Sequence, residues 1–192
     1  MFNLVVDEVE YPSGNRGVRE VVEHPGGSVV VPLLDDGSVL LVNQFRYSVK
    51  KNLFELPAGK LDAGEDPKVC AARELEEETG YTAGTLTELT AIYTTPGFCN
   101  EQLHLYVATD LKKLPTGQRL EEGELDLIVK AIPIDEVIQM IENQDIVDGK
   151  TFAILKRNYV TRPLLRDVTA EVRAERISEA VNTVLGDLRI TH

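Results

Sequence analysis

The sequence predicts one mixed α/β (α+β) domain, in which a strand-rich middle is followed by helices. Two β-branched runs flank Asp35, Asp36 and Gly37, and this pattern predicts a hairpin at residues 28–47. Later segments carry apolar residues at three- and four-residue steps, which predicts helices. The chain has 192 residues and a hydrophobic content of 43%, enough for one domain with an ordinary core.

The other elements are predicted in order from apolar runs and turn residues. Residues 2–27 favour short strands broken by proline, serine and glycine, and residues 52–59 favour a strand that enters a glycine loop. Further strands are predicted at residues 85–96, 101–111 and 125–134, and further helices at residues 134–145, 149–160 and 167–188. The hairpins among them indicate sheets that are mostly antiparallel or mixed.

One more helix is predicted at residues 67–79, with a signal at each end. Asp66 can cap its N-terminus with Pro67 in the first turn, and Gly80 can end it. At about 100° per residue, one side of this helix is expected to be buried. That side carries Ala71, Ala72, Leu75 and Thr79.

Another side of this helix carries three carboxylates, Glu74, Glu77 and Glu78, at spacings of three and four residues. Exposed like charges at such positions repel by about a few tenths of a kcal/mol per pair. Burial in a cleft would raise that cost and push at least one pKa upward, so a cation is expected among them. Oxygen-only ligands favour Mg²⁺ or Mn²⁺. A solvated acidic face is the alternative that the spacing leaves open.

The composition restricts the classes of partner. A net charge of −12 argues against nucleic acids and anionic membranes, but a small anionic substrate could bind through a metal ion. Cys70 and Cys99 fit free thiols better than a disulfide scaffold, and the acidic N-terminus does not fit a signal peptide. We therefore expect a cytoplasmic protein. The histidines, His24, His104 and His192, match no ligand pattern and are expected to be structural.

The spacing of the acidic segment resembles the Nudix box, G-x5-E-x7-R-E-U-x-E-E-x-G-U. The matching positions are Gly59, Glu65, Arg73, Glu74, Leu75, Glu77, Glu78 and Gly80, with Tyr81 in the last, usually aliphatic, position. Outside the box, "VNQFRY", "LFELPAGK", "TTPG", "EEGELDLIV" and "DGKTFAILK" resemble the ADP-ribose pyrophosphatase branch of that family. The resemblance covers about Val5 to Tyr159.

The resemblance implies an α/β/α sandwich with a mixed sheet. It places a Nudix hydrolase domain at residues 1–160, whose N-terminal strands at 1–30 exchange in a homodimer, before a C-terminal helical extension at 161–192. It implies Mg²⁺- or Mn²⁺-dependent hydrolysis of a nucleoside diphosphate sugar, with ADP-ribose giving AMP and ribose 5-phosphate. GDP-mannose or another sugar nucleotide is the alternative substrate. A silent nucleotide-binding module and a cap or dinucleoside polyphosphate hydrolase are less favoured.

The resemblance also assigns roles to residues of the box. It implies that Glu74, Glu77 and Glu78 hold metal, together with the backbone carbonyl of Ala58. Arg73 is expected to orient the glutamates, since it precedes Glu77 by four residues, with a plain surface ion pair as the alternative. Glu65 is expected to tie the preceding loop to the helix.

Outside the box, the branch takes its general base from an acidic loop, which here spans residues 121–124. We expect Glu122 to be the base, in a register uncertain by one or two residues, and Glu124 to reach a metal. Arg46 suits a bidentate phosphate contact, with a surface role as the alternative. Glu101 is a candidate for binding a sugar hydroxyl. Phe98 and Tyr11 are candidates for stacking on the base, with a place in the core as the alternative.

Overall fold

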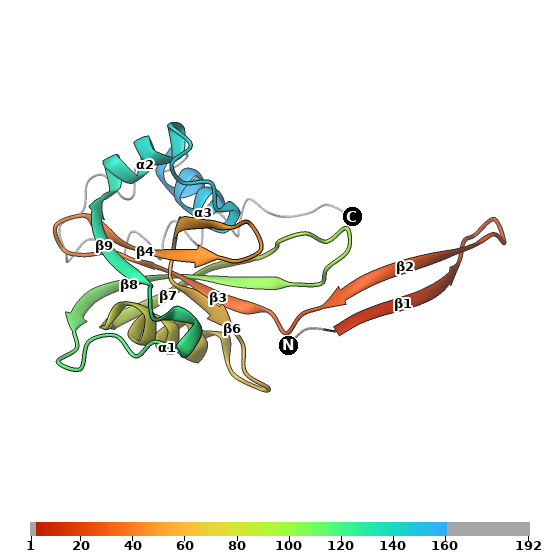
Figure 1. Cartoon of the computed structure of the whole chain (residues 1–192), viewed down its shortest axis with the longest axis horizontal. Coiled ribbons are helices and arrows are strands. Elements are labelled where there is room, and N and C mark those ends of the chain that lie inside the picture. The colour runs from red at the N-terminus through yellow and green to blue at the C-terminus, as the bar shows by residue number, and fades with distance from the viewer. Residues whose placement is uncertain (1–2, 161–192) are drawn as a thin grey trace.

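The computed structural model describes residues 3–160 as β-sheets layered between helices (Figure 1). Helix α1 (Pro67–Thr79) lies on one side, and α2 (Ile134–Glu142) and α3 (Gly149–Val160) lie on the other. The predicted α/β/α sandwich with a mixed sheet is confirmed. The strands are β1 (Asn3–Glu10), β2 (Arg16–Glu23), β3 (Gly27–Pro32), β4 (Ser38–Arg46), β5 (Lys51–Glu55), β6 (Ala58–Lys60), β7 (Tyr81–Tyr93), β8 (Gln102–Lys113) and β9 (Ile128–Pro133), with a 3₁₀ turn, η1, at Glu122–Glu124.

Strand β3 lies inside a four-stranded sheet of order β6-β3-β8-β7. It pairs in parallel with β8 and antiparallel with β6, so this sheet is mixed. All of β3 is buried, because its alternate side chains enter different cores. Val29 and Val31 join the large core shared with α2 and α3, whereas Val30 joins a smaller core beneath α1.

The second sheet has the order β5-β4-β9, with antiparallel pairing throughout. Its inner residues, such as Val39 and Leu41, pack in the large core with Val137 of α2 and Leu155 of α3. This sheet therefore carries the helical layer opposite α1. The predicted strand 125–134 starts only at Ile128, because the preceding residues turn through η1 and the Leu127 amide donates to the Glu124 carbonyl at 2.8 Å.

Helix α1 begins and ends at the predicted residues. The Asp66 side chain accepts a hydrogen bond from the Lys68 amide at 2.7 Å, and Gly80 adopts the left-handed conformation at φ 71°. The predicted placement of Ala72 on the buried side was wrong. Ala72 is exposed, and the buried side instead includes Cys70. Strand β7 follows directly at Tyr81, earlier than the predicted residue 85.

The β1–β2 hairpin projects away from the layered body (Figure 1). Leu4 and Val6 are two residues apart and therefore lie on one face of the hairpin, as does Glu8. Val18 pairs with Glu8 and so lies on the same face. All three apolar side chains are more than half exposed. This apolar stripe therefore lies on the exposed surface of the hairpin.

The predicted helix at residues 167–188, and with it the C-terminal extension 161–192, lies outside the described residues. None of the helices within residues 3–160 has the length and apolar character needed to cross a membrane.

Candidate active site

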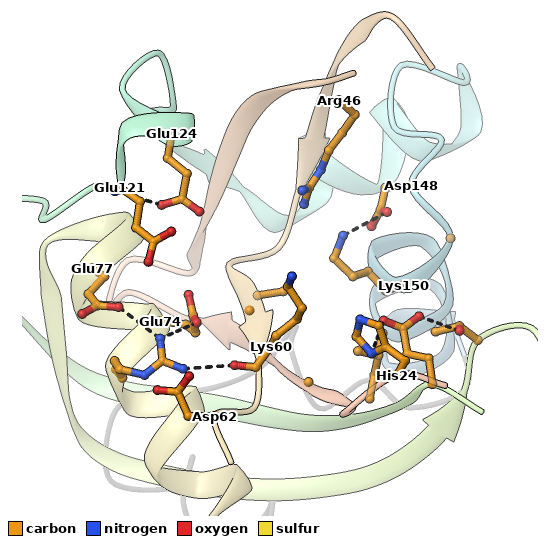
Figure 2. A pocket seen from close by; sticks show the side chains of 18 residues that line it. His24, Arg46, Lys60, Asp62, Glu74, Glu77, Glu121, Glu124, Asp148 and Lys150 are labelled. Carbon is orange, nitrogen blue, oxygen red and sulfur yellow. Dashed lines mark hydrogen bonds and ion pairs between the residues drawn. The ribbon is translucent and has the colours of Figure 1, made fainter. Parts of the chain in front are cut away.

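The acidic face of α1 opens into a cavity of about 850 Å³. This volume is in the range typical of small-molecule sites. The cavity lies where α1, β6, the loop before η1, the end of β4 and the first turn of α3 come together (Figure 2). Segments far apart in the sequence therefore contribute to one site.

The structure gathers most of the residues that the sequence analysis singled out. The cavity is lined by Arg46, Ala58, Arg73, Glu74, Glu77, Glu101 and Glu124. The other candidates, Tyr11, Glu78, Phe98 and Glu122, are not among its lining residues. Glu78 is buried behind the lining, Phe98 is 56% exposed, and Tyr11 follows β1 at the hairpin turn.

The α1 carboxylates press against the backbone of β6. A β-carbon at residue 59 would overlap the carboxylate of Glu74, so the lack of a side chain at Gly59 leaves that carboxylate its present position. One residue earlier, the Ala58 amide donates a hydrogen bond to Glu78 Oε2 at 3.0 Å. Two carboxylates of the helix and the backbone of a neighbouring strand thus share one small space.

Arg73 binds three carboxylates at once. Its Nη1 donates to Glu74 Oε1 at 2.6 Å and to Glu77 Oε2 at 3.1 Å. Its Nε and Nη2 donate to the two oxygens of Glu65, each at 3.0 Å, and Nη2 also donates to the Lys60 carbonyl. The Arg73 hydrogen bonds hold the pKa of Glu65 at about 2, with help from the Asp62 amide. Arg73 therefore joins the loop after β6 to the acidic face of α1.

Burial and mutual repulsion perturb the pKa values of Glu74 and Glu78 on α1. Burial, followed by the charge of Glu74, raises the pKa of Glu78 to about 8. Burial also raises the pKa of Glu74, although Arg73 opposes that change. Such crowding is unfavourable for free carboxylates and favourable for a bound cation.

The donor set fits a hard divalent cation. Carboxylate oxygens of Glu74, Glu77 and Glu78 and the carbonyl of Ala58 are the ligand types that such ions prefer. As they stand, no three acidic, histidine or cysteine side chains in residues 3–160 are close enough to enclose an ion. Arg73 occupies the space between Glu74 and Glu77, so these side chains would have to adjust around an ion.

The acidic loop presents a different pair of residues from the one expected. Glu121 and Glu124 line the cavity, whereas Glu122, on η1, does not. Two hydrogen bonds set the conformation of this loop: the Glu121 amide donates to Glu124 Oε2 at 3.4 Å, which is one half of a capping box, and the Glu124 amide donates to the Glu121 carbonyl at 2.9 Å, which closes the 3₁₀ turn. Glu121 had no predicted role, although the position of the base was left open by one or two residues.

The opposite wall is basic and contains residues that the sequence analysis missed. Arg46 and Lys150 both line the cavity, and both bind the buried carboxylate of Glu55. A charged residue inside the apolar segment "NLFELP" is a signal for a buried ion pair, but nothing local identifies its partner.

A third part of the wall surrounds Glu101. The Thr94 hydroxyl donates to Glu101 Oε2 at 2.7 Å, and His24 Nδ1 lies 3.4 Å from Glu101 Oε1. The His24 backbone amide donates to Asn100 Oδ1, and Val22 bonds through its backbone to Phe98 and Asn100. His24 is therefore a cavity residue that the sequence analysis treated only as structural.

Comparison with known proteins agrees with this geometry. A family model of the NUDIX domain matches residues 24–153. An ADP-ribose pyrophosphatase of Bacillus subtilis (strain 168) is 41% identical over 151 residues, covering 79% of this chain and 81% of that protein. A methanol dehydrogenase activator of Bacillus methanolicus is 44% identical over 149 residues, covering 77% and 80%.

The fold is also found in a solved structure. A crystal structure of an ADP compounds hydrolase matches with a TM-score of 0.70 at 24% identity, over 84% of this chain and 87% of that chain. The NUDIX domain match spans most of the chain and includes α1, whose carboxylates face the cavity. This chain therefore belongs to the Nudix hydrolase family.

Proposed function

We propose that this protein hydrolyses the pyrophosphate of a nucleoside diphosphate sugar, with ADP-ribose as the favoured substrate and AMP and ribose 5-phosphate as products. The observation that carries the proposal is one cavity with a glutamate wall on α1 and a basic wall at Arg46 (Figure 2). A metal-bound diphosphate would be neutralised from both sides there. The similarity to a protein named ADP-ribose pyrophosphatase supports the choice of substrate.

We further propose Mg²⁺ as the metal, with Mn²⁺ as a substitute. Glu74, Glu77 and Glu78 would hold it, with the Ala58 carbonyl and Glu124 as further oxygen ligands. Bound there, the ion would neutralise phosphate oxygens and lower the pKa of the attacking water. The chain itself supplies orientation: Arg73 fixes Glu74 and Glu77, and Arg46 offers its guanidinium to a phosphate.

For the general base, we propose Glu121. Its side chain lines the cavity, and a base must come within hydrogen-bond reach of the attacking water. Glu122, which the resemblance favoured, remains the alternative if the loop turns when substrate binds. Glu101, held by Thr94, is the candidate for a sugar hydroxyl.

The assembly that we propose is a homodimer in which the β1–β2 hairpin is covered by a second copy of the chain. The support is the exposed apolar stripe of Leu4, Val6 and Val18 on a projecting hairpin. We also infer a cytoplasmic location, because Cys70 and Cys99 are both free thiols.

The function is tested by assaying released monophosphate from ADP-ribose and GDP-mannose with Mg²⁺, with Mn²⁺ and with a chelator. We expect the higher kcat/KM with ADP-ribose and no turnover with the chelator. Glu74→Gln and Glu78→Gln should each lower kcat by about 100-fold or more, because each removes a charged metal ligand.

Glu76→Gln is the matched control on the same helix, because Glu76 faces Arg119 outside the cavity. It should leave kcat within about twofold of the wild type. Equal turnover by the Glu74 and Glu76 variants would contradict the metal assignment. A higher kcat/KM for GDP-mannose would replace only the substrate.

The base assignment is tested by comparing Glu121→Gln with Glu122→Gln. We expect Glu121→Gln to lower kcat by about 100-fold and to remove the acidic limb of the pH–rate profile, because a general base is lost. The kcat of the Glu122→Gln variant should fall much less. A deeper loss for Glu122→Gln would return the role to Glu122.

Metal binding should release protons. The metal-free pKa of Glu78 is about 8, so this carboxyl is largely protonated at neutral pH, whereas a ligand must be ionised. Mg²⁺ affinity should therefore rise from about pH 6 to about pH 8. Calorimetry in buffers of different ionisation enthalpy should detect about one proton released per ion near pH 7. The Glu78→Gln variant should release fewer protons per bound ion. An unchanged number of protons in that variant would assign the proton to another group.

The dimer is tested by light scattering. Leu4→Asp combined with Val6→Asp places charge in the apolar stripe and should shift the mass from two chains to one. Val69→Asp, on the exposed side of α1, is the control and should leave the mass unchanged. A wild type that scatters as a single chain would overturn the proposal.

A further inference from the structure

The basic wall of the cavity is organised around one buried carboxylate. Glu55, at the end of β5, has only 2% of its side chain exposed. It accepts hydrogen bonds from Arg46 Nε at 2.7 Å and Arg46 Nη2 at 2.8 Å, and it also binds Lys150 Nζ. Arg46 comes from β4 and Lys150 from the first turn of α3, so two distant elements meet at this residue.

Glu55 remains ionised in this setting. Burial alone would raise its pKa, but the Arg46 hydrogen bonds and the charge of Lys150 outweigh burial and leave the pKa of Glu55 below its usual value. A buried anion without a partner is costly, so neither cation can leave Glu55 without a penalty. The carboxylate therefore fixes the directions of both cations.

Both cations keep donors for a ligand. Arg46 uses Nε and Nη2 on Glu55, which leaves Nη1 of a side chain that is 40% exposed. Lys150 gives one further proton to Asp148 Oδ1 at 3.0 Å, so one of its three ammonium protons has no acceptor within the described part of the chain. Figure 2 shows the side chains of Arg46 and Lys150 directed into the cavity, across from Glu74.

We propose that Lys150 is a second phosphate-binding residue beside Arg46, and that Glu55 is the positioning residue that aims both at the diphosphate. This inference rests on the proposed function, because Arg46 and Lys150 would bind the diphosphate oxygens that face away from the α1 glutamates. A diphosphate presents oxygens on more than one side, and ions held by the glutamates neutralise only the nearer ones. Glu55 itself does not line the cavity, so it acts through its two partners.

The competing explanation is that the cluster only ties α3 to the β4–β5 strands. The matched control is Lys156, which lies on the same helix and pairs with Glu142 at 2.8 Å away from the cavity. Lys150→Met should raise KM for the nucleotide sugar by about tenfold or more and leave kcat within about threefold, as expected when one charge-assisted contact is lost. Lys156→Met should change neither value, and Lys150→Arg should recover most of the loss.

Glu55→Gln separates positioning from packing. It removes the anchor but keeps the shape, so KM should rise about as in Lys150→Met although no cavity residue has changed. The midpoint of thermal unfolding, measured for every variant, shows how much the Glu55 cluster contributes to stability. If Lys150→Met lowers the midpoint while its KM matches that of Lys156→Met, the cluster is only structural and the proposal is overturned.

Calorimetric binding of inorganic pyrophosphate with Mg²⁺ keeps the two proposals distinguishable. Pyrophosphate should bind the Lys150→Met variant about tenfold more weakly than it binds the wild type and Lys156→Met. Equal affinities overturn the role of Lys150. If the wild type turns over no sugar nucleotide and yet shows this difference, the proposed function fails and the phosphate-binding role stands.

Discussion

The carboxylates of Glu74 and Glu78 lie close together and are largely buried, and the surrounding structure accommodates that constraint. Like charges at low dielectric raise each other's pKa, so their neighbours must offset charge without filling the cavity. Arg73 does so from the side by binding Glu74 and Glu77 together, and the Ala58 amide does so from behind by donating to Glu78. The absence of a side chain at Gly59 leaves the Glu74 carboxylate its place.

The layered fold sets this acidic face opposite a basic one. Helix α1 packs on β3 through a small core, and the β4–β5 strands and α3 pack from the other side through a large one. Because β3 contributes to both cores, the elements that carry the two walls of the cavity pack against the same strand. A buried core is closely packed and deforms little, so the spacing between the walls is a property of the fold more than of the cavity side chains.

The sequence predicted what depends on neighbours along the chain. Caps at Asp66 and Gly80, the β-branched runs of β3 and β4 and the spacing of Glu74, Glu77 and Glu78 are local signals. They located α1, most strands and the acidic face. The partnership of Glu55 with Lys150 joins residues ninety-five positions apart, so no periodicity reveals it. Which loop glutamates face the cavity was missed for a different reason. A capping box between Glu121 and Glu124 sets the turn that puts Glu121 into the cavity and Glu122 outside, and several neighbouring glutamates could have formed such a box.

The hairpin is not mechanically separate from the cavity. Val22 of β2 shares backbone hydrogen bonds with Phe98 and Asn100, and the same short loop carries Glu101. Any force that tilts the hairpin is therefore transmitted to the rim where Glu101 meets His24. By thermodynamic reciprocity, a ligand whose binding depended on the hairpin position would in turn change the stability of that position. In the proposed dimer, the contacts between subunits and the affinity for ligand would both depend on the conformation of this one loop.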